Sequence, residues 1–252
     1  MFMRFIYLKI KPEFTDILPS FYNKMILPEL QEIHGCLFGG LVKKSENPED
    51  YVSVTIWDSL ERAEAYERSE SYRKMRDRIR PYLAESTAWE IHLSDDLQLQ
   101  HDSGVEEPVI REYRVTAQRQ TDEEPQLADT PLYVRLVSLK IQKGKMVEFQ
   151  QIYEKEIVPV LQRTGGCRYI YLTESLQDDD EIVSITVWDS KQQADAYEQS
   201  GQFEDLVQKV KHTFSQVYQW KMQLEKKSPG KIKTSDDMKI EYYGLVSGRR
   251  FE

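Results

Sequence analysis

The stretch VSVTIWDS at residues 52–59 recurs as VSITVWDS at residues 183–190, 131 positions later. Each stretch alternates its side chains at period two up to a tryptophan and ends in Asp-Ser, which is typical of a strand followed by a helix N-cap. The helix that follows recurs as well, as AEAYERS at 63–69 and ADAYEQS at 194–200. The chain therefore contains one structural module twice.

The repeat extends far beyond these strings. Residues 2–93 align with 133–224 without a gap, and about 26 of the 92 pairs are identical. The rarest residue types pair completely: Trp57 with Trp188, Trp89 with Trp220, and Cys36 with Cys167. Agreement of this kind without an insertion excludes chance. We therefore predict two modules of one architecture, at 1–94 and 132–225.

Each module reads β-α-β-β-α-β, which is the element order of a ferredoxin-like fold. The elements expected in the first module, with those of the second displaced by 131 positions, are a strand at 2–11, a helix at 15–33, strands at 36–44 and 51–57, a helix broken near Glu70 that ends near 84, and a last strand around Trp89. The fold class is therefore predicted as α+β.

Several single residues mark the ends and irregularities of these elements. Gly35 and Gly166 follow the first helices, where a residue with positive φ closes the last turn. Proline inside both first helices, at 28 and 159, predicts a kink that belongs to the module. Serine at 59 and 190 is the expected N-cap of the second helices, and Gln193 is expected to complete a capping box.

The segments outside the repeat are linkers, each with one more strand. Residues 95–131 are acidic and turn-rich except for VIREYRVTA at 109–117, which has the composition of a strand. Residues 226–252 contain a second such segment, KIEYYGLVS at 239–247. We expect each module to end in a fifth strand that extends a sheet or clasps the other copy.

Composition excludes several classes of protein. The chain of 252 residues carries a formal net charge of −9 and contains 40% hydrophobic residues. An acidic surface repels phosphate backbones and anionic lipid, so we expect no nucleic acid and no membrane as a partner. The N-terminal residues read as a strand and lack the apolar block of a signal peptide. Two cysteines do not make a disulfide framework, so a cytoplasmic location with reduced thiols is expected.

The first helix of each copy, ending in ILPELQEIHGC at 26–36 and IVPVLQRTGGC at 157–167, resembles the antibiotic-biosynthesis monooxygenase (ABM) family. The strand that runs into Trp-Asp-Ser and the alanine-containing helix after it resemble the same family. The resemblance implies a dimeric α+β barrel, formed here by both modules within one chain or by a homodimer. It also implies ligands between each sheet and its helices, or inside the barrel.

Some members of this family oxidise aromatic or quinol substrates without metal or flavin, and others degrade haem. The haem-degrading branch uses an asparagine, a tryptophan and an iron-ligating histidine. In this chain those positions hold Ile6 and Val137, Tyr66 and Tyr197, and Arg76 and Val207. Neither Arg76 nor Val207 can ligate iron in place of that histidine. The four histidines show no zinc spacing, and no GxGxxG or P-loop occurs. We therefore predict no cofactor: no haem, flavin or metal.

The candidate ligand site is assembled from the aromatic residues and two glycines. Trp57 and Trp188 share a strand face with hydroxyl side chains, and Tyr66 and Tyr197 follow on the second helices, where the resemblance implies a pocket. In the first copy Gly39 and Gly40 replace the bulky Ile170 and Tyr171 of the second. Glycine inside a strand accompanies a close ligand, a bulge or close packing. We predict that these residues bind substrate and that the first copy has the roomier pocket; the catalytic residues remain unknown.

Two further pairs leave their roles open. Cys36 and Cys167 are reactive thiols, a disulfide bridge between the two copies, or small buried apolar residues. Arg4 and Arg135 hold an anionic substrate if they point inward and are ordinary edge charges if they point outward.

Three functions compete on the sequence alone. The first is a cofactor-independent monooxygenase acting on a small aromatic or quinol-like substrate, in which the protein desolvates and orients a molecule that itself reduces oxygen. The second is a non-catalytic binder or sensor of a small hydrophobic ligand. The third is an assembly or stress-response protein without a ligand.

Overall fold

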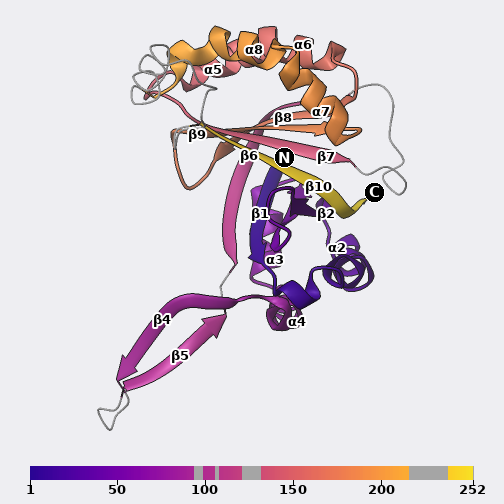
Figure 1. Cartoon of the computed structure of the whole chain (residues 1–252), viewed down its shortest axis with the longest axis vertical. Coiled ribbons are helices and arrows are strands. Elements are labelled where there is room, and N and C mark those ends of the chain that lie inside the picture. Colours follow the sequence, from indigo (N-terminus) through magenta and orange to yellow (C-terminus); the bar gives the residue numbers. More distant parts are fainter. Residues whose placement is uncertain (94–98, 106–107, 121–131, 216–237, 252) are drawn as a thin grey trace. The chain divides into compact units, whose positions relative to one another are not determined.

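The computed structural model describes residues 1–93, 99–105, 108–120, 132–215 and 238–251 (Figure 1). The chain divides into two compact units. Unit 1 comprises residues 1–111 and 246–252, and unit 2 comprises residues 112–245. Each unit is built on one copy of the repeat.

The sheets of the two copies have the same strands and the same register. The strands are β1 (Phe2–Lys9), β2 (Cys36–Lys44) and β3 (Asp50–Trp57) in the first copy, and β7 (Tyr133–Lys140), β8 (Cys167–Ser175) and β9 (Glu181–Trp188) in the second. In both copies the third strand is central and antiparallel to its neighbours. Arg4 lies opposite Thr55, and Arg135 lies opposite Thr186. The duplicated strands predicted from VSVTIWDS are therefore confirmed.

The helices follow the prediction, including the break in the second helix. The first copy contains α1 (Leu18–Phe21), α2 (Leu27–Gln31), α3 (Leu60–Glu67) and α4 (Glu70–Ile79), and the second contains α5 (Met146–Ile152), α6 (Val158–Arg163), α7 (Lys191–Gln199) and α8 (Gln202–Val210). A π-helical turn, at Tyr22–Ile26 and at Tyr153–Ile157, precedes the proline of each first helix. Proline cannot donate an N–H, so the helix widens there in both copies.

The expected helix boundaries are confirmed with one exception. Gly35 and Gly166 have φ of 89° and 83°, which only glycine adopts without strain. The hydroxyls of Ser59 and Ser190 accept hydrogen bonds from the backbone N–H groups three residues later, at 3.4 and 3.3 Å. The capping box is wrong, because the buried Oε1 of Gln193 has no hydrogen-bond partner among the described residues. That amide packs against the Cα of Gly166 instead.

The strand around Trp89 exists, but it does not extend the module sheet. This strand, β4 (Glu85–Leu93), pairs with β5 (Leu99–Val105) as a separate two-stranded sheet. A single bridge between Ile10 and Leu83 remains where the fourth ferredoxin strand was expected. The equivalent bridge in the second copy joins Ile141 to Phe214, and Trp220 lies outside the described residues. β5 was not predicted, because its sequence, LQHDSGV, lacks an apolar alternation.

Both fifth strands are present, as β6 (Val109–Gln120) and β10 (Met238–Arg250). Tyr113–Gln120 of β6 pairs with β8, so the fifth strand of the first copy joins the sheet of the second. Met238–Gly244 of β10 pairs with β7, and the chain continues into unit 1, where the N–H of Phe251 donates to the carbonyl of Leu37 at 2.9 Å. β6 therefore joins the sheet of the other copy and β10 extends the sheet of its own copy, so each of the two arrangements left open by the sequence occurs once.

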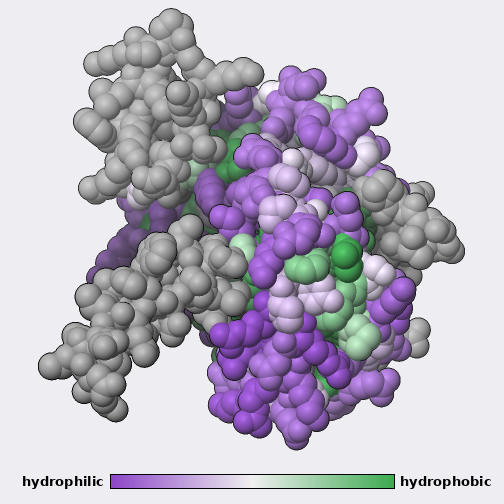
Figure 2. Space-filling model, turned by 60° about the horizontal axis from the view of Figure 1, so that its bottom comes forward, coloured by the Kyte–Doolittle hydropathy of each residue, from purple (hydrophilic) through white to green (hydrophobic). Residues whose placement is uncertain are grey.

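The hydrogen-bonded neighbours follow the order β1-β3-β2 in unit 1 and β10-β7-β9-β8-β6 in unit 2. Two ferredoxin-like modules of the α+β class are therefore confirmed. No helix among the described residues is both long enough and apolar enough to cross a membrane. On the face drawn in Figure 2, hydrophilic residues predominate and hydrophobic ones form only small patches.

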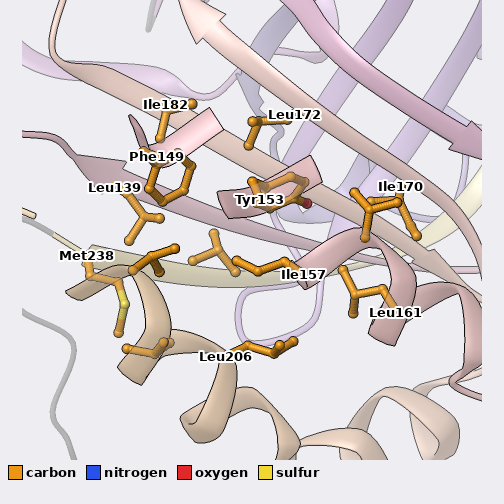
Figure 3. Close-up of a cluster of buried hydrophobic side chains, with 14 of the residues drawn as sticks. Leu139, Phe149, Tyr153, Ile157, Leu161, Ile170, Leu172, Ile182, Leu206 and Met238 are labelled. Carbon is orange, nitrogen blue, oxygen red and sulfur yellow. The ribbon is translucent and has the colours of Figure 1, made fainter. Parts of the chain in front are cut away.

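The core of unit 2 lies between its sheet and its helices. Phe149, Leu161 and Leu206 lie around Tyr153 and Ile157 (Figure 3), and all five side chains are buried. The buried tryptophan of β9 belongs to the same cluster. The strand face that carries the hydroxyls and the tryptophan therefore faces the helices.

Candidate functional site

Each unit has a cavity between the sheet and the helices, and the two cavities lie at equivalent positions of the repeat. In unit 1 the cavity has a volume of about 170 Å³, and Ile6, Tyr22 and Ser53 are among the residues that line it. In unit 2 the volume is about 40 Å³, and the equivalents Val137, Tyr153 and Ser184 line the cavity. The two cavities are copies of one feature, and the first copy has the larger one.

Side-chain size explains the difference in volume. Phe149 and Phe214 line the smaller cavity, where the first copy has Leu18 and Leu83, and Met238 of β10 adds to its wall. The covering helices differ as well. α8 buries three apolar residues, Leu206, Val207 and Val210, whereas α4 buries none. The second copy is therefore packed and the first is open under α4.

A tyrosine and a serine form a polar pair at the wall of each cavity. The hydroxyls of Tyr22 and Ser53 lie 2.8 Å apart, and Tyr22 also donates to the carbonyl of Gly40 at 3.2 Å. The equivalent hydroxyls of Tyr153 and Ser184 lie 2.7 Å apart. Burial raises the pKa of Tyr22 well above its usual value, so the phenol stays protonated. The π-helical turn carries both tyrosines, so this irregularity positions them.

Beside each cavity a buried arginine of the first strand pairs with a glutamate of the second helix. Arg4 donates to Oε2 of Glu67 at 3.0 Å and to the carbonyl of Ala63 at 3.2 Å. Arg135 donates to Oε1 of Glu198 at 2.7 Å. Both arginines point inward, and each positive charge is neutralised by a carboxylate. The arginines are therefore not the free anion holders that one reading of the sequence offered.

The glutamates of the two ion pairs, Glu67 and Glu198, differ in their other contacts. Glu67 is 41% exposed and lines the larger cavity, and Arg4 is its only hydrogen-bond partner among the described residues. Glu198 also accepts a hydrogen bond from the phenol of Tyr242 on β10. The carboxylate of the first copy is therefore accessible from the cavity, and that of the second is covered by a phenol.

The predicted aromatic residues come together in pairs. The rings of Trp57 and Tyr66 lie 5.2 Å apart, and those of Trp188 and Tyr197 lie 5.1 Å apart. Both indoles are fully buried and donate to the threonine two residues earlier at 2.9 Å. Tyr197 lines the smaller cavity, whereas Trp57 and Tyr66 are not among the residues that line the larger one. In the first copy this pair supports the second helix behind the cavity wall.

Gly39 and Gly40 lie elsewhere on the sheet. A Cβ on Gly39 would come within 2.8 Å of Leu30 and 3.3 Å of Phe251, and a Cβ on Gly40 would come within 2.7 Å of the ring of Phe38. Neither glycine is among the residues that line the larger cavity. These glycines make room for neighbouring rings, so the structure does not bring them together with the aromatic pair in one pocket.

No residue that lines the larger cavity was proposed as a site residue from the sequence, including Tyr22, Ser53, Glu67 and Arg76. A signal existed for the first three, because each is identical to its partner across the repeat. For Glu67 the signal was double, since the arginine that binds it is repeated too. Arg76 has the opposite property, because the second copy holds Val207 there.

The two cysteines are free and buried. Burial raises the pKa of both Cys36 and Cys167 to about 12. A thiol with such a pKa is a poor nucleophile at neutral pH, which favours a packing role.

The described residues contain no group of three or more His, Cys, Asp or Glu side chains that could hold a metal ion. His212 is half exposed and lies 2.9 Å from a carboxylate oxygen of Glu148, where it forms a surface pair. His212 is not among the residues that line either cavity.

The fold and the two cavities define the class: duplicated ferredoxin-like modules with a ligand-sized space between sheet and helices. The family model described as antibiotic biosynthesis monooxygenase matches the chain twice, at residues 1–78 and 132–209. The chain belongs to this family, which confirms the resemblance in its first helices and third strands. No curated protein shows a significant match.

Solved structures similar to the chain share its fold along nearly its whole length. A proposed monooxygenase from Lactobacillus acidophilus NCFM is 8% identical with a TM-score of 0.66, covering 99% of this chain and 95% of its own. One from Fusobacterium nucleatum is 10% identical with a TM-score of 0.68, and the match covers 99% of this chain and 94% of the other. An anthrone oxidase-like protein is 12% identical with a TM-score of 0.61, and the match covers 99% of this chain and 92% of the other. At these identities the likeness shows the fold.

Proposed function

We propose that the chain oxidises a small aromatic or quinol-like substrate with dioxygen, without a bound cofactor, in the cavity of unit 1. One observation carries the proposal: an apolar cavity of about 170 Å³ has a carboxylate, that of Glu67, in its wall. For comparison, an engineered apolar cavity of about 150 Å³ in another protein holds benzene. The space therefore suits one substituted ring.

The chemistry needs few groups from the protein. A quinol that loses a proton becomes electron-rich enough to reduce dioxygen directly, so a proton acceptor and a dry environment suffice. Glu67 is the proposed proton acceptor, and Arg4 holds its carboxylate in place at 3.0 Å. The protonated phenol of Tyr22 is the proposed hydrogen-bond donor to a substrate oxygen, and its pairing with Ser53 fixes its direction.

The second copy is proposed to serve as scaffold. A cavity of about 40 Å³ has room for little more than a water molecule. Its glutamate is engaged by both Arg135 and Tyr242. We therefore assign the substrate to the first copy alone. The proposed location of the protein is the cytoplasm.

The second candidate function is a non-catalytic binder that uses the same cavity. It shares the cavity with the first proposal but gives Glu67 no chemical role. Catalysis is favoured by the position of this carboxylate, which is accessible from the cavity although a structural ion pair would not need it there.

The test is oxygen uptake with methylhydroquinone as the probe, corrected for uptake without protein. We expect Glu67→Gln to lower the rate by roughly a hundredfold or more, which is typical of a lost proton acceptor. The matched control is Glu198→Gln, which removes the equivalent charge and should leave the rate within about twofold under conditions where circular dichroism shows both variants folded. Binding without oxygen uptake would select the non-catalytic binder. Equal loss of rate in both variants would contradict the role of Glu67.

A further inference from the structure

The wall of the unit 1 cavity contains two charged residues, Glu67 and Arg76. The charge of Glu67 is balanced by Arg4 at 3.0 Å. Arg76 is exposed and makes no hydrogen bond or ion pair in the described part of the chain. The wall therefore carries one uncompensated positive charge.

The surroundings of Arg76 are basic in a chain that is acidic as a whole. The segment from α4 to the turn after it carries five cations: Arg73, Lys74, Arg76, Arg78 and Arg80. Two of them are engaged, because Lys74 pairs with Glu70 at 2.8 Å and Arg78 pairs with Glu29. The chain as a whole carries a net charge of −9, whereas in this segment the five cations outnumber the two anions, Glu70 and Asp77. This part of the surface therefore attracts anions that the acidic remainder repels.

The second copy supplies an internal comparison. The position equivalent to Arg76 is Val207, which is 7% exposed and lines the small cavity. α8 begins with Glu204 and Asp205, where α4 has Arg73 and Lys74. The second copy keeps cations at the positions of Arg78 and Arg80, as Lys209 and Lys211. The cations at positions 73, 74 and 76 belong only to the copy with the larger cavity.

We propose that the ligand of unit 1 carries an anionic group, as in an aromatic carboxylic acid, and that Arg76 binds this group at the cavity wall. The aromatic ring occupies the apolar part of the cavity between Ile6 and Met75, and the carboxylate meets the guanidinium, whose planar donors match two carboxylate oxygens. This rests on the proposed function for the location of the ligand, and it narrows the substrate to acidic aromatics.

The test compares gentisate, a hydroquinone with a carboxylate, with methyl gentisate, its uncharged ester. Affinities are measured by calorimetry under nitrogen, so that no oxidation occurs. We expect gentisate to bind about tenfold more tightly, as a charge-assisted hydrogen bond allows. Arg76→Val, which installs the residue of the second copy, should remove this preference and leave the affinity for the ester unchanged. Arg76→Lys should keep part of the preference.

The control variant is Arg73→Val, which removes the same charge from α4 at a position that does not line the cavity. It should retain most of the preference for gentisate. Equal affinity of wild type for acid and ester, an equal effect of Arg73→Val and Arg76→Val, or no binding of either probe would overturn the proposal. Binding of gentisate through Arg76 without any oxygen uptake would leave it standing and would contradict the proposed oxidation alone.

Discussion

Filling the two cavities with the same side chain should leave the stability of unit 1 nearly unchanged and should destabilise unit 2. Ile6 and Val137 occupy equivalent positions on β1 and β7, and each lines the cavity of its unit. Ile6→Phe adds three carbon atoms next to about 170 Å³ of space, whereas Val137→Phe adds four next to about 40 Å³. The pair therefore tests the difference in volume without reference to any ligand.

The expected magnitudes follow from burial and overpacking. Three buried carbons contribute up to about 2 kcal/mol at about 0.8 kcal/mol each, and lost side-chain freedom offsets part of that. Ile6→Phe should therefore leave the free energy of unfolding of unit 1 within about 1 kcal/mol of wild type. Val137→Phe should destabilise unit 2 by about 1–3 kcal/mol, because the rings around it already fill the space.

Native-state hydrogen exchange read by mass spectrometry reports on each unit separately, which a single melting curve of two units does not. Peptides from β7 and α8 should lose protection in Val137→Phe, and peptides from β1 should keep theirs in Ile6→Phe. The reasoning would be refuted if Ile6→Phe destabilised unit 1 by more than about 2 kcal/mol while Val137→Phe had no effect on unit 2. Ile6→Phe should also abolish binding of methyl gentisate.

Four further predictions address other parts of the molecule. Glu198→Gln should destabilise unit 2 by about 2–4 kcal/mol in chemical denaturation, because Arg135 is 3% exposed and would lose its counter-charge, while the double change Arg135→Met with Glu198→Leu should recover most of the loss. Cys36 and Cys167 should react with a thiol reagent at pH 8 only after unfolding. Their pKa is raised to about 12 in the folded state, so their contribution to the free energy of unfolding is complete below about pH 9 and is lost as the pH rises toward 12. The chain should have the mass of a 29.8 kDa monomer by light scattering at low micromolar concentration, and a dimer that persists on dilution would count against closure of the barrel within one chain. Purified protein should show neither a Soret nor a flavin absorption band, and haem retained through purification would contradict the absence of a cofactor.

The strands and helices could be predicted because the sequence of each one occurs twice in the chain. A strand such as 52–57 is ambiguous alone, but its second occurrence at the same spacing from Trp188 and Ser190 confirms the register and the helix start. Prediction ended where the copies stop agreeing. β4 pairs with β5, and the linker residues of β5 have no counterpart that would reveal a strand. Pairing partners depend on tertiary contacts, which local alternation does not encode.

The candidate site was harder to predict, for a physical reason. Gly39 and Gly40 drew attention as missing side chains, but volume at a position is decided by neighbours that are distant in sequence. Phe38 and Phe251 take up the room that both glycines leave. The room in the cavity arises instead from the absence of rings at positions 18 and 83, which no local pattern marks. Volume is a sum over several elements, whereas a sequence pattern reports one element at a time.

Comparison of the copies separates the frame of the site from its function. Arg4, Tyr22, Ser53 and Glu67 are all repeated in the second copy, where the cavity is nearly filled, so their shared role is to hold the second helix and the π-helical turn against the sheet. A residue that recurs in a filled cavity is retained for packing, whatever else it does.

Function should then reside in what the first copy has changed on that frame. The changes point in one direction: the second helix loses its buried residues, the carboxylate of Glu67 loses the phenol that covers its counterpart, and Arg76 replaces a buried valine. These differences should make unit 1 less stable than unit 2, because the apolar residues buried under α8 stabilise unit 2 and α4 buries none. Together they open a cavity, expose one proton acceptor and add one cation. This combination is what an acidic aromatic ligand requires, and a packing role alone accounts for none of the three changes.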